Sequence, residues 1–240
     1  MELEDNYEDI IKKAERGLNK KVSSNDINKI AKELNLNLNA LKNIKEEKYK
    51  PKEFDYEKEY DGLKVTKILS HFRGMDVNAY IVVDENKNCV IIDTAQNPDK
   101  IINFVKKEKL NSPIILVTHE HHDHVDGIEN ICENVDAYFF DFEDLKNELI
   151  IDFGKRKIRV FRTLGHSEKS LTYQIGKFLF VGDLIFAGSL GGGGYSYEKL
   201  LESAKMILSL DEDLFIFPGH GPATTVKEEK ENNAFITSKI

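Results

Sequence analysis

Residues 117 to 127 read Val-Thr-His-Glu-His-His-Asp-His-Val-Asp-Gly, and four of the seven histidines of the chain stand in this segment. The apolar run before it, residues 113 to 118, predicts a buried strand. After it, Val125, Ile128 and Ile131 recur at helical spacing. The segment is therefore predicted to be a strand-to-helix loop, where a rigid scaffold presents side chains to a cleft.

The side chains of this loop are those of a metal site. Imidazole nitrogens and a carboxylate suit zinc, iron or manganese better than calcium or magnesium. Alternate residues of an extended loop share a face, so His119 and His121 can bind one ion. Asp123 and His124 stand where the helix begins and can face a second ion. Taken alone, the segment is also compatible with a second interpretation, a run of surface histidines that merely adsorbs metal.

Composition sets the class of protein. The 240 residues allow one large domain, or a medium domain with an appendage, and 40% hydrophobic with 32% charged residues is ordinary for a globular chain. A net charge of −8 argues against a broad nucleic-acid surface. We expect a cytoplasmic protein without a membrane span: Met1 to Tyr7 lack signal-peptide character, and Cys89 and Cys132 look like buried, reduced thiols.

Residues 1–60 predict a small helical appendage followed by a linker. Apolar residues recur at helical spacing within residues 10–18, 27–34 and 38–44, a pattern that resembles the helix-turn-helix of small bacterial repressors. The segment carries 13 basic and 14 acidic residues, the wrong balance for binding phosphates. Packing or a homodimer through these helices is therefore favoured over DNA. Lys48 to Tyr60, dense in charge, predicts a solvated linker.

Residues 61–240 predict a second unit, rich in strands. Strands are expected at residues 63–72, 77–84, 89–93, 137–140, 157–164, 171–175, 178–181 and 214–217, and helices at 98–109, 142–149 and 198–210. Strands first, then strands alternating with helices, imply a sheet-rich α/β (α+β) core covered by helices.

Three more candidate ligands stand at the ends of predicted strands. His166, Asp183 and His220 each follow a glycine, which permits close backbone approach or an unusual backbone angle. Each residue alone is as well explained by local hydrogen bonding in a turn. Their shared placement at strand ends favours a common site.

The four motifs together resemble the metallo-β-lactamase superfamily, and within it the glyoxalase II (hydroxyacylglutathione hydrolase) branch. The motifs are Thr-His-x-His-x-Asp-His (118–124), Leu-Gly-His-Ser (164–167), Gly-Asp-x-x-Phe (182–186) and Pro-Gly-His-Gly (218–221). The resemblance covers residues 63 to 237 and implies an αββα metallo-β-lactamase sandwich with the metals at one edge. It implies a metallo-hydrolase with two divalent ions, zinc in the first place and iron or manganese as alternatives.

The resemblance also implies a role for each residue. His119, His121 and His166 would hold the first ion, the second would lie on Asp123, His124 and His220, and Asp183 would bridge them. A hydroxide between the ions would attack the carbonyl carbon of a small thioester or ester. Asp123 would also pass a proton to the leaving group. His122 and His71 are expected to lie outside the site.

Two departures from that branch bear on the substrate. Only 20 residues follow His220, so the helical domain that grips glutathione there is not expected here. Four glycines, 191–194, replace a motif with an arginine, and Tyr195 or Tyr197 can line the pocket instead. It is equally consistent with the sequence that these two tyrosines only cover the hydrophobic core.

Two other functions stay open. A persulfide dioxygenase-like enzyme has a similar motif set with a single iron. A sensor would bind a ligand at the metal domain and a partner or DNA through the N-terminal helices.

Overall fold

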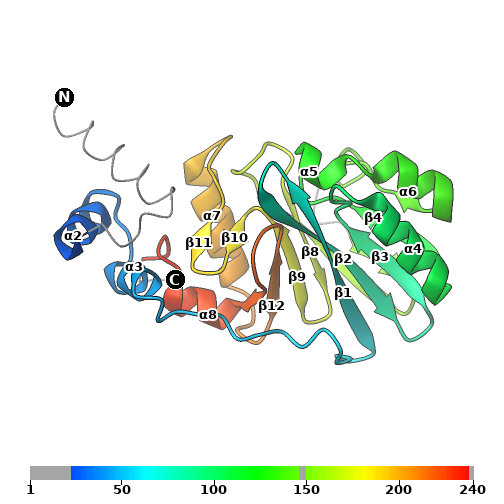
Figure 1. Cartoon of the computed structure of the whole chain (residues 1–240), viewed down its shortest axis with the longest axis horizontal. Helices are drawn as coiled ribbons and strands as arrows, with labels where there is room; N and C mark the ends of the chain where they lie inside the picture. The colour runs from blue at the N-terminus through cyan, green and yellow to red at the C-terminus, as the bar shows by residue number, and fades with distance from the viewer. Residues whose placement is uncertain (1–22, 146–149, 238–240) are drawn as a thin grey trace.

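Two β-sheets pack face to face in the part of the chain that the computed structural model describes, residues 23–145 and 150–237 (Figure 1). The helical stripe predicted within residues 10–18 lies outside the described residues. The first sheet has the strand order β1-β2-β3-β4-β5. Its strands are β1 (Leu63–Phe72), β2 (Met75–Asp84), β3 (Asn88–Ile92), β4 (Asn111–Leu116) and β5 (Tyr138–Phe139).

The second sheet has the order β13-β12-β9-β8-β7-β6. Its strands are β6 (Ile150–Phe153), β7 (Arg156–Arg162), β8 (Leu171–Ile175), β9 (Phe178–Gly182), β12 (Phe215–Pro218) and β13 (Thr224–Thr225). A short hairpin of β10 (Ile185–Phe186) and β11 (Ser189–Leu190) follows β9. Because β9 and β12 run parallel, with Gly182 opposite Pro218, the residues that follow both strands emerge at the same edge of the sheet.

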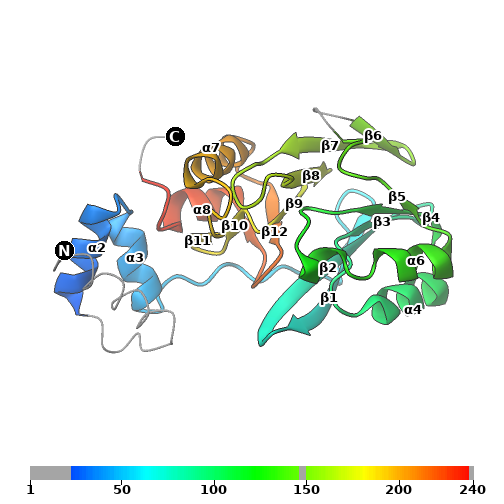
Figure 2. The same ribbon diagram turned by 90° about the horizontal axis from the view of Figure 1, so that it is seen from above.

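Helices cover the outer faces of the sheets (Figure 2). The first sheet carries α4 (Pro98–Glu108) and α6 (Ile128–Val135), and the second carries α7 (Tyr197–Leu208) and α8 (Val226–Asn232). Ser196 caps α7 with its side chain, and Pro98 opens α4, where a missing backbone N–H removes no helical hydrogen bond. The layers are helix, sheet, sheet and helix, which confirms the predicted αββα sandwich. None of the helices in the described ranges has the length and apolar character needed to cross a bilayer.

The alternation of side chains along the strands builds this sandwich. On β9, Phe178 and Phe180 face the opposite sheet, whereas Leu179 and Val181 face the helices. The first sheet divides in the same way, with Val82 turned to the other sheet and Ile81 to α4 and α6. Both faces of each sheet are therefore buried, which explains why the central strands read as nearly continuous apolar runs.

The N-terminal helices lie against the C-terminal end of the described chain. These helices are α2 (Ser24–Glu33), which Ser23 and Asp26 close with a capping box, and α3 (Leu38–Lys45), which contacts α8. The backbone N–H of Asn37 donates to the carbonyl of Ala234 at 2.8 Å. The hydroxyl of Tyr49 donates to the buried carboxylate of Glu229 at 2.7 Å. Whether a second copy also uses these helices stays a prediction, as does the division at residue 60.

The prediction of a solvated linker at Lys48–Tyr60 is wrong in one respect. Phe54 is only 6% exposed and joins the core between the sheets, where its ring lies 4.9 Å from that of Phe217 and 5.0 Å from that of Phe215. The charged neighbours of Phe54 conceal a short apolar face whose partners are far away in the sequence. Charge density alone could not reveal this packing.

Smaller differences concern short elements and one thiol. Strands β6, β10, β11 and β13 and helix α8 escape prediction because two to seven residues carry little periodicity. The helix expected at 142–149 is wrong for residues 142–145, which form turns, and its remainder lies outside the described residues. Cys89 is buried as expected, whereas Cys132 is only partly buried.

Candidate metal centre

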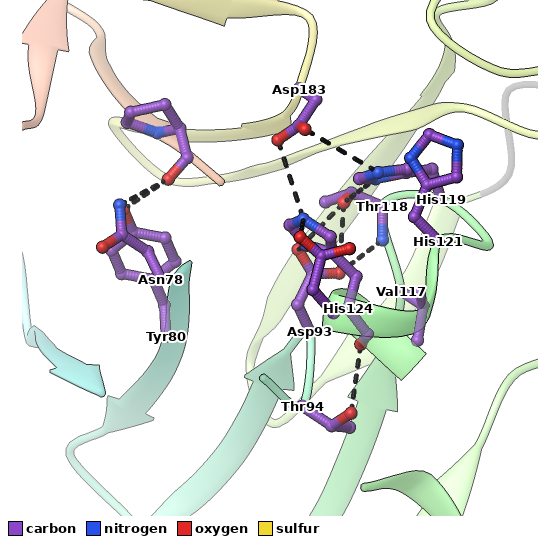
Figure 3. Close-up of polar contacts among 12 residues, drawn as sticks. Asn78, Tyr80, Asp93, Thr94, Val117, Thr118, His119, His121, His124 and Asp183 are labelled. Atoms are coloured by element: carbon purple, nitrogen blue, oxygen red, sulfur yellow. Dashed lines mark hydrogen bonds and ion pairs between the residues drawn. The ribbon is translucent and has the colours of Figure 1, made fainter. Parts of the chain in front are cut away.

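All seven candidate ligands meet at one edge of the sandwich, although they come from four separate parts of the chain. His119 and His121 lie in the loop after β4, and Asp123 and His124 lie in α5 (His122–Val125). The remaining three follow three strands of the second sheet: His166 follows β7, Asp183 follows β9 and His220 follows β12. Figure 3 shows the carboxylate of Asp183 facing the rings of His119 and His124.

Asp183 lies at the centre of the group. Its oxygens stand within 4.0 Å of a ring nitrogen of four histidines, at the Nε2 atoms of His119 (4.0 Å), His124 (3.7 Å), His166 (3.6 Å) and His220 (3.3 Å). Two further contacts complete the cluster: Nε2 of His166 lies 3.0 Å from Nδ1 of His121, and Nε2 of His220 lies 3.6 Å from Oδ2 of Asp123.

These contacts form three overlapping groups, each with ligand atoms within 4.8 Å of one another. The groups are His119-His121-His166, Asp123-His124-His220, and His119-His124-Asp183. The first two are the ligand sets that the resemblance implied for the two ions. The third joins them through the carboxylate expected to bridge.

Three buried polar atoms of the cluster show that it suits cations. Nε2 of His119, Nε2 of His124 and Oδ1 of Asp183 are buried and have no hydrogen-bond partner. Buried polar groups in folded proteins are almost always hydrogen-bonded, because leaving them unpaired is unfavourable. Buried imidazole nitrogens and a buried carboxylate oxygen that lie within 4.8 Å of one another suit a divalent cation.

Hydrogen bonds behind two of the histidines fix which nitrogen faces the cluster. Nδ1 of His124 lies 2.8 Å from the buried carboxylate of Asp93, so Nδ1 carries a proton, and in the neutral ring the lone pair of Nε2 is free. The hydroxyl of Thr118 donates to Asp93 at 2.9 Å and lies 3.1 Å from Nδ1 of His119. One carboxylate therefore orients both rings (Figure 3).

Backbone carbonyls do the same for two other rings. Nδ1 of His166 lies 2.8 Å from the carbonyl of Gly192, and Nδ1 of His220 lies 2.6 Å from the carbonyl of Asp76. A carbonyl only accepts hydrogen bonds, so each Nδ1 carries a proton, and in the neutral ring each Nε2 presents its lone pair to the cluster. Four of the five histidines thus offer the same atom.

Burial and charge shift the ionisation of these groups in opposite directions. Burial, aided by the neighbouring His124, lowers the pKa of His119 well below its usual value. Burial also opposes the charged form of His220, but the hydrogen bond and charge of Asp183 outweigh it and raise the pKa of His220 to about 9. The pKa of His124 is raised too, because Asp93 overcomes the effect of burial. The pKa of Asp183 lies well below its usual value: burial alone would raise it, but the surrounding histidines prevail.

Two glycines allow the backbone to approach the cluster closely. A Cβ atom on Gly219 would lie 2.7 Å from Cε1 of His124 and would overlap Oδ1 of Asp183. A Cβ on Gly191, the first of the four consecutive glycines, would overlap the carbonyl oxygen of Asp183. Both glycines are therefore required by the space that the candidate ligands occupy.

A shallow hollow of about 390 Å³ opens beside the first group. It is lined by Glu120, His121, His166, Ser167, Glu168, Gly192, Gly194 and Tyr195. Tyr195 thus stands where a substrate contact is expected, whereas Tyr197 begins α7 and does not line the hollow. A larger hollow of about 630 Å³ lies along β1 and contains none of the candidate ligands.

The remaining histidines lie outside the cluster, as expected. Nδ1 of His122 is 3.2 Å from Asp126 at the surface, and Nδ1 of His71 is 2.5 Å from Asp76. Sequence reasoning missed Asp93, which follows β3 as Asp183 follows β9. Its signal was only a place at the end of the strand predicted at residues 89–93, because Asp93, unlike Asp183, follows no glycine and belongs to none of the four motifs.

Comparisons with known proteins place the chain in a family. The family model described as the metallo-beta-lactamase superfamily matches residues 73–138 and 143–220. The hydroxyacylglutathione hydrolase GloC of Haemophilus influenzae is 26% identical over 198 residues, which are 68% of this chain and 93% of that protein.

Two solved structures are similar as well. The BLEG-1 B3 metallo-beta-lactamase is 28% identical with a TM-score of 0.65, over 72% of this chain and 100% of that one. The protein TTHA1623, crystallised in a di-iron-bound form, is 26% identical with a TM-score of 0.59, over 69% of this chain and 98% of that one. The likenesses confirm the resemblance and the metallo-hydrolase expected from the four motifs. The chain therefore belongs to the metallo-β-lactamase superfamily.

Proposed function

We propose that the chain is a hydrolase that uses two divalent metal ions to cleave a small thioester or ester. The observation that carries the proposal is the set of three buried, unpartnered atoms on His119, His124 and Asp183, at the junction of two groups of ligands. A site made only for structure would pair these atoms with hydrogen-bond donors or acceptors.

The donor set indicates which residues would hold which ion. His119, His121 and His166 would hold the first, and Asp123, His124 and His220 the second, with Asp183 shared. Nitrogen-rich sets of this kind suit zinc, with iron and manganese as alternatives. A pair of such ions supplies an acidified water as nucleophile and polarises the carbonyl oxygen of the substrate.

The protein's own contribution is to orient these ligands and to carry a proton. Asp93 holds the ring of His124 directly and the ring of His119 through the hydroxyl of Thr118. The carbonyls of Gly192 and Asp76 hold the rings of His166 and His220. Hydrolysis adds water across the acyl bond, so a C–O bond forms, the C–S or C–O bond to the leaving group breaks, and the leaving atom takes a proton. Asp123, whose Oδ2 lies 3.6 Å from Nε2 of His220, is the carboxylate placed to pass that proton.

The comparisons support the reaction class and the number of ions. The relative from Haemophilus influenzae is named for thioester hydrolysis of hydroxyacylglutathione, and TTHA1623 was solved with two irons. The hollow beside His121 and His166 has room for a small acyl or thiol group, with Tyr195 on its wall.

The test pairs metal analysis with a panel of thioesters. Purified protein is expected to bind two equivalents of metal by mass spectrometry and to hydrolyse at least one small thioester. His124→Ala and Asp123→Ala should lower metal content and turnover together. His122→Ala is the matched control, because His122 lies in the same motif with its side chain exposed and directed at Asp126.

Two results would count against the proposal. Unchanged thioester turnover in the His124→Ala and Asp123→Ala variants would place the activity elsewhere. A single bound iron, with oxygen consumption in the presence of a persulfide, would replace hydrolysis by the dioxygenase alternative.

A further inference from the structure

The hollow beside the candidate metal centre is lined by acidic side chains. Its two charged side chains other than histidine are Glu120 and Glu168, and within the described residues no lysine or arginine lines it. The glycines on its wall add no side chain, and the carbonyl of Gly192 is already engaged by His166. Any group of a substrate that enters the hollow therefore meets two carboxylates.

We infer that this hollow selects substrates that place a neutral or positively charged group there, and that it disfavours a carboxylate or phosphate. The inference rests on the proposed function, because it assigns the substrate class of that same site. Its physical basis is the Coulomb interaction between the substrate group and the two glutamate carboxylates that line the hollow.

The carboxylate of Glu120 is fixed in place. The hydroxyl of Ser167 donates to Oε2 of Glu120 at 2.6 Å, and Ser167 is itself buried. The bond joins the loop that carries His121 to the loop that carries His166. Glu120 is exposed, and this hydrogen bond holds one of its carboxylate oxygens at the wall of the hollow.

Two lysines lie close to the hollow without lining it. Nζ of Lys169, next to Glu168 in the chain, lies 5.9 Å from the centre of the Phe142 ring. Nζ of Lys199 lies 4.8 Å from the centre of the Tyr195 ring and lines a separate hollow together with Arg162. Nζ of Lys199 also donates to the hydroxyl of Tyr195 at 3.4 Å. Neither lysine is among the residues that line the hollow.

The position of the hollow makes its charge matter for substrates. Its wall includes His121 and His166, two members of the first ligand group. The third member, His119, directs a buried and unpartnered nitrogen into the same group. A substrate bound at that group must project one of its ends past Glu120 and Glu168.

The experiment compares two matched series of thioesters with the metal-loaded full chain. In the first series the acyl group is acetyl, and the thiol is thiocholine, N-acetylcysteamine or 3-mercaptopropionate, which are positive, neutral and negative. In the second series the thiol is N-acetylcysteamine, and the acyl group is β-alanyl, butyryl or succinyl. Together the two series establish which end of the substrate occupies the hollow.

In at least one series, kcat/KM is expected to be roughly tenfold lower for the negative member than for the positive one, and the ratio should shrink at high salt. Glu168→Gln and Glu120→Gln should each reduce the ratio, chiefly by improving the negative member. Glu129→Gln, an exposed glutamate on α6, is the control and should leave the ratio unchanged.

The outcomes separate this inference from the proposed function. Hydrolysis of all members without any order by charge, or a ratio unmoved by both glutamine variants, overturns the inference and leaves the hydrolase intact. Failure to hydrolyse any member of either series overturns the proposed function, and the inference falls with it.

Discussion

Oδ2 of Asp93 and Nδ1 of His124 lie 2.8 Å apart, and both side chains are almost fully buried. The pair links the end of β3 to the metal loop after β4, two neighbouring strands of the first sheet. Because the same carboxylate also accepts from Thr118, it orients His124 directly and His119 through one hydroxyl. Asp93 therefore orients one histidine in each of the two candidate ligand groups.

Replacing that carboxylate should weaken metal binding without unfolding the protein. We expect Asp93→Asn to lower metal affinity about 10–100-fold, because a neutral amide with one acceptor oxygen cannot hold both His124 and Thr118 as the carboxylate does. Competition with a chromophoric chelator measures the change. Asp126→Asn is the matched control, since Asp126 pairs with the exposed His122 in a similar way. Equal affinities for the two variants would contradict the role of Asp93.

Metal binding should release protons at neutral pH. Without metal, the pKa of His220 is raised to about 9, so this ring carries a second proton at pH 7, and the charge of Asp93 raises the pKa of His124 as well. Metal binds only the neutral ring, so affinity should rise as pH increases toward about 9. Calorimetry in two buffers of different ionisation enthalpy counts the protons. A flat affinity over this range would contradict the expectation.

The same pairing predicts how the metal-free protein responds to pH. A raised pKa means that the folded state binds the proton more tightly than the unfolded state. The His220–Asp183 pair therefore contributes stability fully below about pH 6.5, and this contribution is lost as pH rises through about 9. Urea denaturation of metal-free protein at several pH values checks the sign. A His220→Asn variant should show a weaker dependence in that range.

Two adjacent glycines should respond differently to alanine. A Cβ on Gly191 would overlap the carbonyl of Asp183, whereas a Cβ on Gly192 meets no atom within 4 Å. We expect Gly191→Ala to lower the free energy of unfolding by roughly 1–3 kcal/mol and to reduce metal content, because the backbone at Asp183 must move. Gly192→Ala should change neither quantity greatly. Denaturation curves and metal analysis of both variants provide the comparison.

The segment expected to be a solvated linker should prove important for stability. Phe54→Ala is predicted to lower the free energy of unfolding by about 3–5 kcal/mol, since it opens a cavity among Phe178, Phe215 and Phe217. The exposed neighbour Glu53 serves as control, and Glu53→Ala should have little effect. A loss below about 1 kcal/mol for Phe54→Ala would mean that this packing contributes little.

Long elements were predictable because their patterns are long. Strand β1 begins and ends at the predicted residues, and α4 and α7 begin or end within two residues of the prediction. Short elements such as β13 and α8 were missed, since they are held by neighbours rather than by their own periodicity. For a similar reason Phe54 looked exposed: three of the aromatic rings that cover it, those of Phe178, Phe215 and Phe217, lie more than a hundred residues away in the sequence.

By itself the sequence determined the chemistry of this protein: histidines and aspartates at strand ends, each of three preceded by glycine, and four motifs that identify the superfamily. Local spacing and side-chain type suffice for such conclusions. Only the tertiary structure decided that Asp183 lies within 4.0 Å of four histidines, that Asp93 holds two of them, and that the hollow beside them is acidic. These relations join residues from separate strands, and their distances depend on how the two sheets pack rather than on any local pattern.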